Sequence, residues 1–204
     1  MSESSGGGAK DYPILPVTLQ ADARARQFER AVRQERHPEY AVIIDNESGM
    51  VLGDRIRGGR QVIPFTQQQL ESMRGRILSH NHPDGWRYPA DDPRRPGAGF
   101  SDHDARMLAD WELVEIRAVT PAYLYRLRPP EDRMSHYHQH IVGRSSWVIK
   151  DAVDRAFDLA DLHLTNLVAI GMIAPEVYEA LINHEAMLRL TKDWGIVYER
   201  EVLA

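Results

Sequence analysis

The sequence predicts an α/β fold in which a mixed, curved sheet is flanked by helices. Short runs rich in β-branched residues, such as 40–45 (YAVIID) and 76–79 (RILS), have the length and composition of buried strands. Amphipathic segments such as 22–34 lie between them, with apolar residues at helical spacing. Strands that alternate with helices along the chain are typical of α/β domains.

The character of the chain changes after Pro129 and Pro130. The segments 145–170 and 175–192 are long, apolar-rich and helically periodic, and Gly171 and Pro175 separate them. We expect their apolar faces to pack on the sheet domain or to form a homodimer. The predicted organisation is a disordered leader at 1–12, an α/β domain at 13–130 and a C-terminal helical extension at 131–204.

The remaining elements follow from local patterns. Asn46 to Gly49 predicts a turn between strands, Thr66 and Ser101 are expected N-caps, and 84–100 is expected to be a long irregular loop. Further strands are expected at 50–56, 114–119 and 123–127, and further helices at 67–75 and 101–112.

Composition limits the classes of function. The 204-residue chain has a net charge of −5, so nucleic acid is not an expected partner. It has no apolar run long enough to span a membrane and no secretory signal at its start, so we expect a cytoplasmic location and no membrane partner. It contains no cysteine, so any metal site must use His, Asp and Glu.

The strongest chemical signal is a pair of histidines followed by a helix start rich in acids. His80 and His82 lie at i and i+2 on an extended segment and therefore point to the same side. Asp104, in the first turn of the helix after Ser101, can complete three protein ligands and leave a fourth position open for water. A metal ion in such a site lowers the pKa of water from about 16 to about 7.

Two further residues can serve a hydrolytic reaction. Glu39, before the strand at 40–45, is the candidate general base, with Glu47 as a rival. Ser101 can support an oxyanion, or it can act only as an N-cap. The rival third metal ligands are Asp91, Asp92 and Asp102.

These residues, in this order, resemble the JAMM (MPN-plus) metallopeptidases: Glu39, then His80-x-His82-Pro83, then Ser101-x-x-Asp104. The resemblance covers roughly 20–130, and the wording HNHP is similar to the RadC-like and phage-associated JAB branch. It implies a JAB/MPN-like domain of cytidine-deaminase-like topology, Zn²⁺ on His80, His82 and Asp104, Glu39 as the base and Ser101 at the oxyanion. The seventeen residues of 84–100 make the interval between proline and serine longer than is usual in that family.

The resemblance implies a hydrolase that cuts an amide bond, a metalloprotease or isopeptidase acting on a protein or peptide such as a ubiquitin-like tail. The alternative is a phage- or prophage-associated assembly protein that keeps the metal site without peptidase activity. Two histidines and one aspartate also suit iron. A ββα-metal nuclease is disfavoured, because the letters HNH are contiguous here and the flanking sequence is not basic.

Other candidate residues have simpler interpretations. His136, His138 and His140 are expected to be exposed linker histidines, because no acidic residue accompanies them in phase. His103 is expected to face outward from its helix. Trp86 and Tyr88 either face the substrate or form a small core of their own loop.

Overall fold

The computed structural model describes residues 15–59, 62–140 and 146–203. Its strands are β1 (Tyr40–Asp45), β2 (Ile56–Arg57), β3 (Arg76–Asn81), β4 (Glu115–Val119), β5 (Tyr123–Arg128) and β6 (Val197–Val202). Its helices are α1 (Leu19–Val32), α2 (Gln67–Glu71), the 3₁₀ helix η1 (Pro83–Arg87), α3 (Asp102–Asp110), α4 (His136–His140), α5 (Ser146–Ala169) and α6 (Pro175–Trp194).

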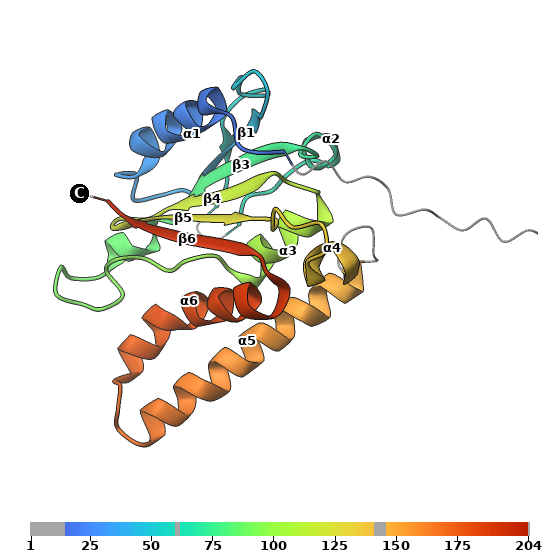
Figure 1. Cartoon of the computed structure of the whole chain (residues 1–204). Coiled ribbons are helices and arrows are strands. Elements are labelled where there is room, and N and C mark those ends of the chain that lie inside the picture. Colours follow the sequence, from blue (N-terminus) through green and yellow to red (C-terminus); the bar gives the residue numbers. More distant parts are fainter. Residues whose placement is uncertain (1–14, 60–61, 141–145, 204) are drawn as a thin grey trace, which may run out of the picture.

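The strands form one mixed sheet in the order β2-β1-β3-β4-β5-β6. Only β3 and β4 run parallel, and the other neighbours are antiparallel. Helix α1 covers one face, and α3 with α5 and α6 lies on the other (Figure 1). The expected α/β fold with a mixed sheet flanked by helices is therefore present.

The alternation of side chains along the strands divides the core into two parts. Val42 and Ile44 of β1 pack with α1, whereas Ala41 and Ile43 face the layer that contains α3 and α5. All four side chains are buried. A strand sends successive side chains to opposite faces, so the sheet separates two distinct environments.

Two strand boundaries differ from the sequence prediction. The expected strand at 50–56 is reduced to a single bridge between Ile44 and Val51 and to the two residues of β2. In contrast, β3 continues through His80 to Asn81, because this central strand pairs with β1 on one side and with β4 on the other. His80 therefore lies within the sheet, although the expected strand ended at residue 79.

The segment after Arg128 also contains a strand that the sequence analysis did not expect. Helices α5 and α6 have the predicted helical character, but β6 then returns to the sheet and pairs along the whole of β5. Ion pairs support the ladder, such as Arg126 Nη2 to Glu201 Oε2 at 2.6 Å. Among the described helices, none is long and apolar enough to cross a membrane. The leader predicted at 1–12 lies outside the described residues.

Candidate metal centre

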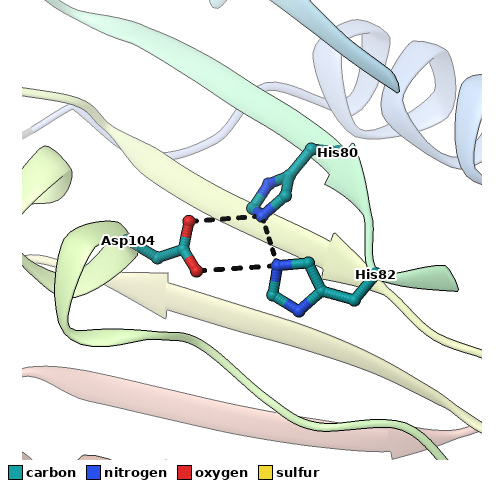
Figure 2. A group of neighbouring side chains, drawn as sticks. All are labelled: His80, His82 and Asp104. Atoms are coloured by element: carbon teal, nitrogen blue, oxygen red, sulfur yellow. Dashed lines mark hydrogen bonds and ion pairs between the residues drawn. The ribbon is translucent and has the colours of Figure 1, made fainter. Parts of the chain in front are cut away.

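Three side chains converge at the end of β3, as Figure 2 shows. His80 Nε2 and His82 Nε2 are 2.8 Å apart, His80 Nε2 is 3.3 Å from Asp104 Oδ1, and His82 Nε2 is 3.6 Å from Asp104 Oδ2. Ligand atoms of a tetrahedral zinc ion with bonds near 2.0–2.1 Å are about 3.3 Å apart. The three side chains thus have the spacing needed to hold one metal ion.

The local structure explains why these side chains meet. His80 points from β3 toward the α3 side of the sheet, and His82, two residues later, points the same way. Asp104 occupies the third position of α3, where an acid is favoured by the helix N-terminus. The strand end and the helix start therefore supply the ligands from two rigid elements.

Ser101 fixes the carboxylate of Asp104. The Ser101 N–H and hydroxyl both donate to Asp104 Oδ2 at 2.8 Å, and the Asp104 N–H donates back to Ser101 Oγ at 3.2 Å. This reciprocal pattern is a capping box. Burial opposes ionisation of Asp104, but His80, His82 and the Ser101 N–H outweigh it and hold its pKa below the ordinary value. The serine is thus an N-cap, and its hydroxyl is directed at the ligand Asp104.

The outer nitrogens of the two rings differ. His82 Nδ1 lies 3.2 Å from the carbonyl oxygen of Ala98, so a proton on Nδ1 leaves Nε2 free as a ligand. His80 Nδ1 is buried and has no hydrogen-bond partner among the described residues. The loop before α3 therefore orients one ligand ring.

Glu39 lies beside the ligand group and lines the same cavity. Its backbone N–H donates to Gly59 O at 2.9 Å, and its carbonyl accepts from the Gly58 N–H at 2.8 Å. Burial raises the pKa of Glu39 to about 7, with Asp104 and Asp84 adding to the rise and His82 opposing it. A carboxylate with a pKa near neutrality is suited to general base chemistry.

The cavity has a volume of about 430 Å³. Besides the predicted residues, three polar side chains line it that the sequence analysis did not assign to the site, namely Asp84, His103 and Asn183. His103 is exposed as expected, but it borders the cavity. Asn183 comes from α6 and donates to Gly99 O at 3.2 Å. Only Asp84 had a local signal, because it follows the HNHP segment directly.

The rival residues lie elsewhere. Asp92 pairs with Arg94 at 2.8 Å, and Asp102 pairs with Arg106 at 2.6 Å. Asp91 is exposed, and Glu47 is exposed in the turn at the far end of β1. The structure brings none of the four into the ligand group formed by His80, His82 and Asp104.

The long loop packs on itself. The Arg95 guanidinium lies 4.3 Å from the centre of the Trp86 ring, and the Arg94 guanidinium lies 4.3 Å from the Tyr88 ring. Trp86 Nε1 donates to the carbonyl of Arg33 at 3.0 Å. Neither aromatic ring lines the cavity, which favours the loop-core interpretation.

The three histidines expected to be exposed in a linker lie on the short helix α4, where His136 and His140 are exposed and His138 is half-buried. His136 stacks on Trp194 with ring centres 4.8 Å apart, and His138 Nε2 lies 2.8 Å from Pro130 O. Among the described residues, the only group of three or more possible metal ligands is the one at His80.

Comparisons with known proteins give no further guide. The chain matches no protein-family model, no curated protein and no solved structure.

Proposed function

We propose that this chain is a zinc-dependent hydrolase that cuts an amide bond in a protein or peptide. The convergence of His80 Nε2, His82 Nε2 and the Asp104 carboxylate, with Glu39 in the same cavity, is the observation that carries the proposal. Three protein ligands with a remaining open position are typical of catalytic zinc sites, whereas structural sites are closed by four.

The residues present fit a divalent cation. Asp104 is buried and ionised, and the two imidazoles present ring nitrogens toward it. Within the described part of the chain, no arginine or lysine pairs with Asp104 or Glu39. Zinc, when bound, supplies Lewis acidity that lowers the pKa of water and polarises a carbonyl.

The chain supplies the proton transfers. Glu39, ionised, accepts a proton from the attacking water and returns it to the amine that leaves. Its raised pKa makes both transfers favourable near neutral pH. Ser101 holds Asp104 in position, and a rotation of its hydroxyl toward the cavity would let it donate to an oxyanion.

The ordered set of Glu39, His80, His82, Ser101 and Asp104 supports a place among the JAMM metallopeptidases as part of this proposal. An assembly protein that only keeps a metal would need neither a base nor an open coordination position. The buried Glu39 beside the ligand group therefore favours the hydrolase.

The metal site is tested by metal analysis of protein purified without added metal. We expect one zinc ion per wild-type chain and none in Asp104→Ala, with both proteins folded by circular dichroism. Stoichiometric iron in the wild type would support the metal site but contradict zinc as its metal. Equal metal content in the two proteins would remove Asp104 from the ligand set.

The role of Glu39 is tested separately. Glu39→Gln should keep the metal and the fold and lower the rate of peptide cleavage by roughly 10²- to 10⁴-fold, because a general base contributes about that much. Glu47→Gln is the matched control, since Glu47 is an exposed carboxylate near the other end of β1. Unchanged cleavage in Glu39→Gln would exclude this residue as the base.

A further inference from the structure

We propose that the cavity beside the ligand group binds a large apolar side chain of the substrate, next to the bond that is cut. The inference rests on the proposed function and adds the class of residue that the enzyme selects. A ubiquitin-like tail with only small residues beside the bond would not provide such a side chain.

Apolar side chains form most of the cavity wall away from the ligands. Val62, Ile63 and Phe65 come from the segment before α2, Leu78 from β3 and Met107 from α3. Leu78 and Met107 are buried, Ile63 and Phe65 are partly buried, and Val62 is 68% exposed. An exposed valine at the border of a cavity has apolar surface that a ligand can cover.

Backbone hydrogen bonds hold this wall at a fixed place relative to Glu39. Glu39 pairs with Gly58 and Gly59 as described, and the Gly59 N–H donates to Val62 O at 2.8 Å. A Cβ atom on Gly58 would lie 2.6 Å from Val62 O, so a residue other than glycine would displace Val62. The candidate base and the apolar wall are therefore coupled through two glycines.

The size and charge of the cavity define the side chain. A volume of about 430 Å³ lies in the usual range of ligand pockets, and a glycine beside the bond would leave the apolar part unfilled. Glu39, Asp84 and Asp104 all border the cavity, so an acidic side chain would meet repulsion. A leucine-, methionine- or phenylalanine-like side chain fits both conditions.

The test uses hydroxamates, which chelate zinc and need no peptide cleavage. Binding of acetohydroxamate and of a hydroxamate that carries an isobutyl group is measured by calorimetry on the zinc-loaded protein. We expect the isobutyl compound to bind roughly 10- to 100-fold more tightly, the gain for burying a leucine-sized side chain.

Two valine variants locate the effect. Val62→Asn should remove most of the isobutyl gain, measured as the ratio of the two hydroxamate affinities, without adding a charge to the cavity. Val202→Asn is the matched control, because Val202 is 75% exposed on β6 and does not line the cavity. Both substitutions replace an exposed valine, so both proteins are expected to fold.

The outcomes separate the inference from the proposed function. Equal affinity of the two hydroxamates, or an equal loss of the gain in both variants, would overturn the apolar subsite and leave the metal site standing. A protein that binds neither zinc nor acetohydroxamate would overturn both.

Discussion

Buried carboxylates have an arginine partner on one face of the sheet and none on the other, among the described residues. On the α1 face, Arg117 is fully buried, and its guanidinium contacts Glu29 Oε1 at 2.7 Å, Asp22 Oδ1 at 2.7 Å and Glu115 Oε1 at 3.3 Å. On the α3 face, the buried carboxylates of Asp104 and Glu39 have no such arginine among the described residues. Neighbouring strands carry the two sites: β3 supplies His80 to the α3 face, and β4 supplies Arg117 and Glu115 to the α1 face.

This difference shows which buried charges are neutralised by other residues of the chain. A buried charge is stable only when it is paired, and the arginine of the α1 face provides that pairing within the chain. The α3 face instead presents two imidazoles and a carboxylate at metal-ligand spacing. We therefore interpret the first cluster as structural and the second as a site completed by a cation from solution.

Removing the internal cation should have the largest effect. Arg117→Met leaves Glu29 buried without an arginine and leaves Glu115 with Arg128 alone, and we expect a loss of about 3–5 kcal/mol in the free energy of unfolding. Urea denaturation measures it. Arg126→Met is the control: its partners Glu199 and Glu201 are on the exposed edge strand, so it should lose at most about 1 kcal/mol. Equal losses would show that the buried ion pairs of Arg117 stabilise the fold no more than the exposed ion pairs of Arg126.

Adding the external cation should have the next largest effect. Zinc at 100 times its dissociation constant should raise the free energy of unfolding by about 2.7 kcal/mol, because it binds only the folded site. Asp104→Asn should abolish this gain while keeping the capping hydrogen bonds. Asp22→Asn, on the other face, should retain the gain; its loss there would contradict the division between the faces.

The α1 cluster should also make stability depend on pH. Burial raises the pKa of Glu115 from 4.5 to about 7, although Arg117 and Arg128 oppose the rise. The folded state therefore holds a proton that the unfolded chain has already lost, and its contribution to stability falls by about 2 kcal/mol as the pH rises from about 5 to about 7. Denaturation across this range should show a flatter profile for Glu115→Gln than for wild type. Parallel profiles would contradict the assignment.

The capping serine should give the smallest effect. Ser101→Ala should cost about 1 kcal/mol of stability through the lost N-cap and should also weaken zinc binding, because Asp104 loses a hydrogen bond that orients it. Thr66→Ala removes the equivalent capping box of α2. It should reduce stability without changing zinc affinity, as measured by chelator competition; a matching fall in affinity would argue against a specific role for Ser101.

Local patterns in the sequence were enough to predict the parts of the fold that depend on near neighbours. The runs at 40–45 and 76–79 correspond to β1 and β3, and the Ser-x-x-Asp spacing corresponds to the capping box that starts α3. Spacing also brought His80 and His82 together, because two residues on a strand share a face.

Features that depend on distant partners could not be predicted in this way. Strand β6 carries alternating charges whose partners on β5 lie more than 70 residues earlier in the chain. In the sequence, Arg117 is an ordinary strand residue, because its partner Glu29 lies in α1, 88 residues earlier in the chain. The cavity wall likewise depends on the packing of three separate segments, which contribute Val62, Met107 and Asn183.

The position of β6 has a mechanical consequence for the helical hairpin. The chain leaves the sheet at the end of β5, passes through α4, α5 and α6, and returns to lie beside β5 (Figure 1). The helical segment is thus attached to two adjacent strands, one at each of its ends. This double attachment restricts its motion relative to the sheet more than a single connection would. Because Asn183 lies in α6, the pairing of β6 with β5 adds a second restraint on its position, besides its hydrogen bond to Gly99.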